Sequence, residues 1–215
     1  MSYRLLVFDW DGTIIDSASA IVECIQEAAR DAGLQVPTRE RAAHTIGLGL
    51  HDALRFAVPD LAAERYAEFV ANYRKHFLVR QDTMRLFEGM RPLLESLSKK
   101  HPLAVATGKS RRGLDRALDA TGLKPFFMAS RCADETNPKP HPAMLLELMD
   151  QLGFEKNQTL MIGDTTHDLQ MARSAGVDAL AVTYGAHHED GLRACRPLGC
   201  FSSVTELQQW LTKNA

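Results

Sequence analysis

Short apolar runs alternate with helical patterns over most of the chain. A continuous apolar run bounded by polar residues is typical of a buried strand, and apolar residues three or four positions apart are typical of a helix that covers it. Strands are predicted at 5–8, 102–106, 126–130, 159–163 and 179–183. Helices are predicted at 90–100, 110–121, 142–152, 166–175 and 203–211. This alternation predicts an α/β fold, in which helices cover both faces of one parallel sheet and the crossovers are right-handed.

A purely helical stretch interrupts this alternation between the first and second predicted strands. One helix begins after Asp16 or Ser17, either of which can cap it, and ends at Gly33. A second, longer helix follows Pro59-Asp60. Their apolar residues at helical spacing are Ala18, Ile21, Ile25, Ala28 and Ala32 in the first, and Leu61, Phe69, Tyr73 and Phe77 in the second. An inserted all-helical domain is therefore expected.

The insertion divides the chain into two predicted parts. Residues 1–15 and 82–215 form the α/β core, and residues 16–81 form the helical domain. Asp16 and Asp82 lie at the two junctions. Hinge residues are expected at such positions, so the helical domain is predicted to move as a lid.

Composition narrows the class of protein without naming a function. The 215 residues are 45% hydrophobic and 24% charged, as in an ordinary globular protein, and the formal net charge is -2. This charge provides no electrostatic footprint for nucleic acid or an anionic membrane surface. No apolar run is long enough to cross a bilayer, and the run after Arg4 is too short for a signal peptide, so a cytoplasmic location is expected. Composition leaves monomer and homodimer both open.

The four cysteines lack the spacing of metal ligands or of a disulfide framework. They are Cys24, Cys132, Cys195 and Cys200. We expect free thiols, most of them buried.

Two carboxylates follow the first apolar run within Asp9-Trp10-Asp11-Gly12-Thr13. At the carboxyl end of a parallel strand, where open α/β sheets place ligands, alternation would point Asp9 and Asp11 the same way. They could then share a divalent cation and still leave one carboxylate for chemistry. Gly12 permits a sharp turn. An ordinary Asp-Gly turn is the alternative for this stretch alone.

Two further clusters offer contacts for an anion. Thr107-Gly108-Lys109-Ser110 follows a strand and opens a helix, which presents a hydroxyl, a backbone N–H and a positive helix end to a phosphate oxygen, although a simple helix cap is the alternative. Lys109 is expected to be solvated. Lys139 lies between prolines in Asn137-Pro138-Lys139-Pro140-His141-Pro142, and this rigid backbone would hold its ammonium in place. His141 is expected to cap the following helix.

A last cluster completes an acidic pocket. In Gly163-Asp164-Thr165-Thr166-His167-Asp168, Asp164 follows a strand and Asp168 returns to the same side after one helical turn. Oxygen ligands from Asp9, Asp11, Asp164 and Asp168 would select Mg²⁺ over Zn²⁺. A helix-capping role for Asp164 or Thr165 is the alternative. His167 is expected to be exposed.

The ordered set Asp9-x-Asp11-Gly12-Thr13, Thr107-Gly108, Lys139-Pro140 and Gly163-Asp164-x-x-x-Asp168 resembles the four motifs of the haloacid dehalogenase-like hydrolase superfamily. The helical insertion resembles the cap of the subgroup that contains phosphoglycolate phosphatases and β-phosphoglucomutases. The resemblance implies a Rossmann-like core under a mobile cap and a Mg²⁺-dependent phosphatase. It also implies that Asp9 is the nucleophile, Asp11 the general acid and base, Thr107 a phosphate ligand, Lys139 the charge neutraliser and Asp164 a magnesium ligand. Asp168 would support Lys139 or a metal-bound water.

These residue types suit hydrolysis of a phosphate monoester. Asp9 can attack phosphorus in line if Mg²⁺ and Lys139 offset the repulsion between two anions, and an aspartyl phosphate results. Asp11 would protonate the leaving group and later activate water. The expected partner is a small phosphorylated metabolite, with phosphoglycolate first by resemblance. A sugar-phosphate mutase and a pyrophosphatase remain alternatives, and a receiver-like or non-catalytic phosphate-binding protein is a weaker one.

Substrate choice is expected to lie in the cap. The bend Thr45-Ile46-Gly47-Leu48-Gly49-Leu50 resembles the family's specificity loop, with His51 and Arg55 on the helix that follows. Gly47 and Arg55 are candidate substrate-binding residues, together with Thr107, Gly108 and Lys139, although an ordinary turn between helices is equally compatible with Gly47. His187-His188-Glu189-Asp190 could form a second metal site, but a solvated loop is favoured.

Overall fold

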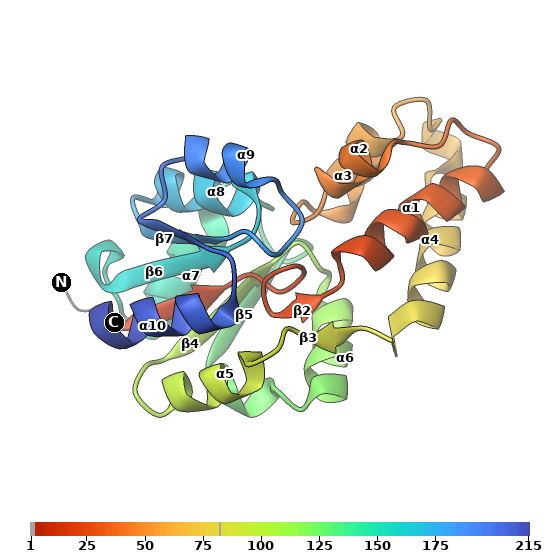
Figure 1. The fold of residues 1–215 in the computed structure, drawn as a ribbon. Coiled ribbons are helices and arrows are strands. Elements are labelled where there is room, and N and C mark those ends of the chain that lie inside the picture. Colours follow the sequence, from red (N-terminus) through yellow and green to blue (C-terminus); the bar gives the residue numbers. More distant parts are fainter. Residues whose placement is uncertain (1–2, 82) are drawn as a thin grey trace.

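A parallel sheet of six strands forms the centre of the protein (Figure 1), and the strand order is β5-β4-β1-β6-β7-β8. The structure is a computed structural model that describes residues 3–81 and 83–215, so Asp82, a predicted hinge residue, lies outside the described residues. The strands are β1 Leu5–Phe8, β4 Leu103–Thr107, β5 Ala129–Cys132, β6 Thr159–Gly163, β7 Asp178–Val182 and β8 Gly199–Phe201. All five strand pairs are parallel. The predicted α/β fold with a Rossmann-like parallel sheet is confirmed.

Helices cover the two faces of this sheet. On one face lie α5 (Met90–Ser98), α6 (Arg111–Thr121) and α10 (Val204–Asn214), whose apolar residues pack with Leu6 and Phe8 of β1. On the other lie α7 (Ala143–Leu152), α8 (Thr166–Ala175) and α9 (Glu189–Ala194), which pack with Leu5 and Val7. Alternate residues of β1 thus serve opposite cores, which explains why the whole strand is apolar.

The helical insertion has an apolar cluster of its own. It contains α1 (Ala18–Asp31), α2 (Arg39–Ala43), α3 (Leu50–Ala57) and α4 (Tyr66–Gln81), and residues such as Ile25, Leu54 and Phe69 are buried among these helices. A short antiparallel ribbon, β2 (Ile15–Asp16) with β3 (Arg85–Leu86), joins the insertion to the core. Figure 1 shows the four helices standing beside the sheet, connected to it through this ribbon.

Most predicted elements agree with the structure to within a few residues, and β1, β6 and α8 agree at both ends. The strand predicted at 126–130 is wrong in its first half. Residues Lys124–Phe126 form a 3₁₀ turn with a proline in its first positions, and β5 starts only at Ala129. The sequence analysis missed β2, β3, β8, α2 and α9, all of which are short.

The cysteines and the membrane prediction can also be compared with the structure. Cys24 and Cys132 are buried, Cys195 and Cys200 are half-buried, and all four are free, as predicted. Among residues 3–81 and 83–215, no helix combines the length and the apolar character that a membrane crossing requires.

Candidate active site

The carboxyl ends of β4, β1 and β6 carry three of the predicted site residues. These strands are neighbours in the middle of the sheet. Thr107 is the last residue of β4, Asp9 directly follows β1 and Asp164 directly follows β6. All three side chains are buried. Because parallel strands end at one edge of the sheet, residues far apart in the sequence meet there.

Three carboxylates form the centre of the site. One carboxylate oxygen each from Asp9, Asp164 and Asp168 lies within 4.8 Å of the others. Thr13 Oγ1 and Ala186 N both donate hydrogen bonds of 2.7 Å to Asp164. Asp168 accepts from the backbone N–H and the hydroxyl of Thr165, which caps α8. The capping alternative is therefore correct for Thr165, but it does not remove Asp164 or Asp168 from the site. We call these three carboxylates the acidic triad.

Lys139 is the one cation in direct contact with the acidic triad among the described residues. Its Nζ lies 2.5 Å from Asp9 Oδ1 and 2.6 Å from Asp168 Oδ1, and its side chain is fully buried. Burial by itself would lower the pKa of Lys139, but Asp168 and Asp9 raise it above its usual value, so the ammonium stays charged. The predicted alternative in which Asp168 supports Lys139 agrees with this geometry.

When all three of its carboxylates are ionised, the acidic triad carries more negative charge than Lys139 can balance. Three ionised carboxylates beside one ammonium leave two excess negative charges in a buried site. Oδ2 of Asp9 is buried and has no hydrogen-bond partner among the described residues. Burial raises the pKa of Asp9 well above its usual value, with added repulsion from Asp168 and Asp164, although Lys139 opposes this. A divalent ion that prefers oxygen ligands, such as Mg²⁺, would fit this charge and donor set.

The stability of the metal-free protein should vary with pH because of Asp164. Burial, with repulsion from Asp168, raises the pKa of Asp164 from 3.8 to about 7. Between these pH values the folded protein keeps a proton that the unfolded chain releases, so this carboxyl lowers the free energy of unfolding as the pH rises. In EDTA we expect the Tm difference, wild type minus Asp164→Asn, to fall from pH 5 to pH 8.

Comparison with Asp164→Asn is needed because other groups titrate in the same window. The pKa of His187 is lowered by burial to about 4, and this shift makes the folded state more stable as the pH rises. We also expect Mg²⁺ at pH 8 to raise the Tm of the wild type more than that of Asp164→Asn. A Tm difference that is independent of pH would contradict the assigned environment of Asp164.

Asp11 lies apart from the acidic triad in this structure. Its carboxylate accepts from Ser17 Oγ at 2.7 Å and pairs with Lys109 Nζ at 2.9 Å. Alternation does not apply to Asp9 and Asp11 because β1 already ends at Phe8, and the chain turns from there. Metal ligation by Asp11 therefore stays a prediction, and Ser17, expected as a helix cap, binds Asp11 instead.

The prediction that Lys109 is solvated is wrong. The Lys109 side chain is 12% exposed, and its ammonium lies 4.8 Å from the ring centre of Phe77 on α4. Lys109 thus links Asp11 of the core to the helical insertion. Ser110 caps α6, which leaves the buried Thr107 hydroxyl at the end of β4 without a capping role.

The predicted specificity loop touches the core at this edge of the sheet. A side chain at Gly108 would overlap the carbonyl oxygens of Gly47 and Leu48. Gly47 has a φ of +91°, and a Cβ there would lie 3.0 Å from Thr165 Oγ1. Gly47 therefore lies beside the site, as its predicted role requires. Arg55 is exposed on α3, and its role in substrate binding stays a prediction.

Similarity to known proteins identifies the family of this chain. The model of the haloacid dehalogenase-like hydrolase family matches residues 6–182. The chain belongs to this family. The probable phosphatase IndB of Dickeya dadantii (strain 3937) is 38% identical over 210 residues, covering 94% of this chain and 91% of the relative.

A second relative and a solved structure extend the comparison. The pyrophosphatase PpaX of Halalkalibacterium halodurans is 31% identical over 210 residues, covering 96% of both chains. A crystal structure from Bacteroides fragilis, whose description names a haloacid dehalogenase-like hydrolase, superimposes with a TM-score of 0.86 at 26% identity. The match covers 96% of this chain and 100% of the other.

Sequence analysis of this haloacid dehalogenase-like hydrolase missed the loop after β7. Ala186 N binds Asp164, and Tyr184 donates to the carbonyl oxygen of Thr13 at 3.2 Å. Between them, a side chain at Gly185 would overlap the Asp164 carboxylate and the Gly12 carbonyl oxygen. The signal was available, since this loop follows a predicted strand at the same edge of the sheet.

A methyl group at Gly185 should displace Asp164. We expect Gly185→Ala to weaken Mg²⁺ binding by roughly 10-fold or more, as when the support of a metal ligand is lost. Isothermal titration of Mg²⁺ would measure this change. Gly191→Ala is the matched control, because a Cβ there meets nothing closer than Thr166 Cγ2 at 3.7 Å. Equal Mg²⁺ affinity in the two variants would rule out the proposed contact between Gly185 and a metal ligand.

Three histidine predictions can be assessed. His141 accepts a hydrogen bond from Ala143 N at the start of α7, so the expected capping role is confirmed. The prediction that His167 is exposed is wrong, because His167 is only 7% exposed. The solvated loop predicted at 187–190 is correct only in part. His188, Glu189 and Asp190 are exposed, but His187 is buried and Glu189 begins α9.

Proposed function

We propose that this haloacid dehalogenase-like hydrolase is a Mg²⁺-dependent phosphatase that cleaves a small phosphate monoester through an aspartyl-phosphate intermediate. The observation that carries the proposal is the environment of Asp9. One of its oxygens contacts Lys139, and the other is buried without a hydrogen-bond partner among the described residues. Asp164 and Asp168 lie beside it. A carboxylate in this position is suited to bind a metal and to attack phosphorus.

The roles of the residues follow from their contacts. Asp9 forms a bond to phosphorus, and the bond from phosphorus to the leaving oxygen breaks. Lys139 offsets the repulsion between Asp9 and the phosphoryl group, and Thr107 with the Gly108 N–H would hold the other phosphate oxygens. When bound by Asp9, Asp164 and Asp11 or Asp168, Mg²⁺ supplies further positive charge to the same region. The acidic triad otherwise repels the substrate.

Asp11 is proposed to move the protons. It gives a proton to the departing alkoxide and then accepts one from the water that hydrolyses the aspartyl phosphate. Ser17 and Lys109 hold its carboxylate in position. Dehalogenases of the superfamily lack this second aspartate because a halide leaves without a proton. Asp11 therefore favours phosphate esters or anhydrides as substrates.

The helical insertion is proposed to be a mobile cap. We assign residues 16–81 to the cap and residues 1–15 and 82–215 to the core. The separate apolar cluster of α1 to α4 and the thin β2–β3 ribbon support this division. The contact of Gly47 and Leu48 with Gly108 would have to open for a substrate to enter. We also place the enzyme in the cytoplasm, which agrees with its four free cysteines.

Phosphoglycolate is the first candidate substrate, because the motifs and the cap resemble the subgroup that contains phosphoglycolate phosphatases. Pyrophosphate is the second, since the relative from Halalkalibacterium halodurans is a pyrophosphatase. A sugar-phosphate mutase would use the same core, but it would need a cap that excludes water. Each candidate is a small anion, and the proposed partner is therefore a small phosphorylated metabolite.

Hydrolysis of p-nitrophenyl phosphate tests the proposal. We expect turnover with Mg²⁺, loss of turnover in EDTA and recovery when Mg²⁺ is restored. A release assay for inorganic phosphate would then compare phosphoglycolate, sugar phosphates and pyrophosphate at equal concentration. Absence of turnover on all of them with Mg²⁺ would refute the phosphatase and leave a phosphate-binding protein. Isomerisation of a sugar phosphate without phosphate release would indicate the mutase.

A further inference from the structure

Three histidines from distant parts of the chain meet where the helical insertion contacts the core. His44 follows α2 of the insertion, His167 is the second residue of α8, and His187 precedes α9. One ring nitrogen from each lies within 4.8 Å of the others. The proposed phosphatase mechanism uses none of these residues. We call them the histidine cluster.

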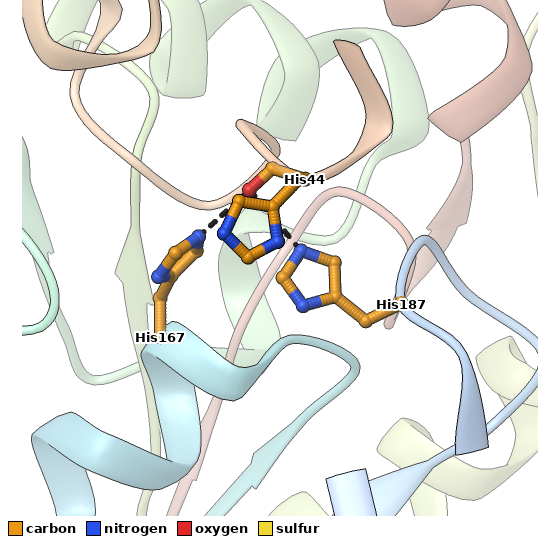
Figure 2. A group of neighbouring side chains, drawn as sticks. All are labelled: His44, His167 and His187. Atoms are coloured by element: carbon orange, nitrogen blue, oxygen red, sulfur yellow. Dashed lines mark hydrogen bonds between the residues drawn. The ribbon is translucent and has the colours of Figure 1, made fainter. Parts of the chain in front are cut away.

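The rings of the histidine cluster lie close together. The rings of His44 and His187 are nearly parallel, with their centres 5.0 Å apart. The centre of the His167 ring lies 5.2 Å from each of these two centres. Figure 2 shows His167 and His187 directed at the same backbone carbonyl, that of His44. The distances from this oxygen to their Nε2 atoms are 2.8 and 3.3 Å.

His187 is neutral at neutral pH, because burial lowers its pKa to about 4. A neutral imidazole keeps one nitrogen lone pair, which is the form that binds metals. His187 Nδ1 accepts from Thr166 N at 3.1 Å, which places the ring proton on Nε2. The same inference from hydrogen bonding places the proton of His167 on Nε2, leaving its Nδ1 with the lone pair.

We propose that His44, His167 and His187 bind one divalent transition metal ion, Zn²⁺ in the first instance, between the helical insertion and the core. Three imidazoles suit Zn²⁺, whereas Mg²⁺ prefers oxygen, so this site and the acidic triad select different ions. Three protein ligands leave a fourth tetrahedral position for water. The ring nitrogens must approach by roughly 1 Å to reach Zn–N distances of about 2.0–2.1 Å. A ring that binds through Nε2 must carry its proton on Nδ1 and give up its hydrogen bond to the His44 carbonyl. At His187 the Nδ1–H would then donate to Thr166 Oγ1, 3.3 Å away, in place of the bond that Nδ1 now accepts from Thr166 N.

Such an ion would fasten the insertion to the core. His44 immediately precedes the Thr45–Leu50 bend. The carbonyl oxygens of Gly47 and Leu48 in this bend lie so close to Gly108 that a Cβ there would overlap them. Zn²⁺ at the histidine cluster would therefore hold this bend over the acidic triad. The binding part of the inference is independent of the proposed function. The consequence for turnover, inhibition by a closed cap, rests on it.

Zn²⁺ binding to purified variants tests the site. Competition with a chromogenic chelator, in excess Mg²⁺ to occupy the acidic triad, would compare the wild type with His44→Ala and His187→Ala. We expect one Zn²⁺ per chain and a loss of affinity of about 10-fold or more in each variant. His188→Ala is the matched control, since His188 is exposed and adjacent to His187. Equal affinities in all four proteins would overturn the proposal.

Co²⁺ provides a second readout that does not depend on activity. A tetrahedral site with three nitrogens gives strong visible absorption, whereas a six-coordinate oxygen site absorbs weakly. We expect strong bands in the wild type and in His188→Ala, and their loss in His44→Ala, whose exposed side chain can be removed without opening the core. Weak absorption in every protein would mean that the three histidines only join the insertion to the core by hydrogen bonds.

The link to cap closure is tested separately. Hydrogen exchange of residues 44–50 should slow when Zn²⁺ is added to the wild type and remain unchanged in His44→Ala. If p-nitrophenyl phosphate is hydrolysed, Zn²⁺ should inhibit the wild type more than His44→Ala. Histidine-dependent Zn²⁺ binding in a protein without phosphatase activity would support the site and refute only the proposed function. Exchange that Zn²⁺ does not change would overturn its role in closure.

Discussion

Asp9→Asn is expected to lower the rate of phosphate monoester hydrolysis by roughly 10⁴-fold or more, because the substitution removes a covalent nucleophile. Asparagine has nearly the same shape in this buried position, but its amide cannot form an acyl phosphate. The loss should appear in kcat for p-nitrophenyl phosphate. Circular dichroism should show an unchanged fold. Asp150→Asn, an exposed position on α7, is the matched control and should retain full activity.

Trapping the phosphorylated enzyme separates the roles of Asp9 and Asp11. After an acid quench with labelled p-nitrophenyl phosphate, the wild type should carry label and Asp9→Asn should carry none. Asp11→Asn should accumulate label, because p-nitrophenolate leaves without a proton but the attacking water then lacks its base. Label on Asp9→Asn, or full turnover by it, would remove Asp9 as the nucleophile.

Lys139→Met is expected to reduce both stability and activity. The Lys139 ammonium is fully buried between Asp9 and Asp168, and methionine is of similar length but carries no charge. Removing one partner from a buried ion pair costs about 3–5 kcal/mol of unfolding free energy, because the remaining charges have lost their partner. Loss of a preorganised charge at the phosphoryl group should lower kcat by roughly 10²–10³-fold. Urea unfolding and p-nitrophenyl phosphate turnover measure the two effects.

A second substitution distinguishes charge from packing. Lys139→Met with Asp168→Asn removes one of the stranded carboxylates, so it should recover part of the lost stability without recovering activity. This variant also keeps the prediction testable if Lys139→Met alone does not fold. Lys99→Met, at an exposed lysine paired with Glu95, should change stability by less than about 1 kcal/mol. A stable Lys139→Met with normal turnover would exclude Lys139 from the proposed mechanism.

Prediction from sequence succeeded for the core because the pattern there is local. The apolar residues of β1 and β6 mark fully buried strands, and a residue that follows such a strand must lie at its carboxyl end. This rule by itself predicts that Asp9, Thr107 and Asp164 lie at one edge of the sheet. It failed for the geometry of Asp11, since the direction of a side chain after a strand depends on the turn.

Contacts between the insertion and the core could not be predicted from local sequence patterns. Lys109 had the pattern of a solvated residue, because its partners Asp11 and Phe77 are brought to it by different elements. His167 and His187 were predicted to be exposed to solvent for the same reason. The neighbour that covers them, His44, belongs to α2–α3 of the insertion, more than 100 residues earlier in the chain.

The amino-acid sequence by itself determined the alternation of strands and helices along the core, its interruption by a helical insertion, and the set of acids and lysine at the strand ends. These features follow from the spacing of apolar residues and from what comes directly after each run. Only the tertiary structure decided which charges pair, that the Tyr184–Ala186 loop holds Asp164, and that three histidines meet. Such contacts depend on how separate elements pack against one another, and no local pattern in a single chain specifies that packing.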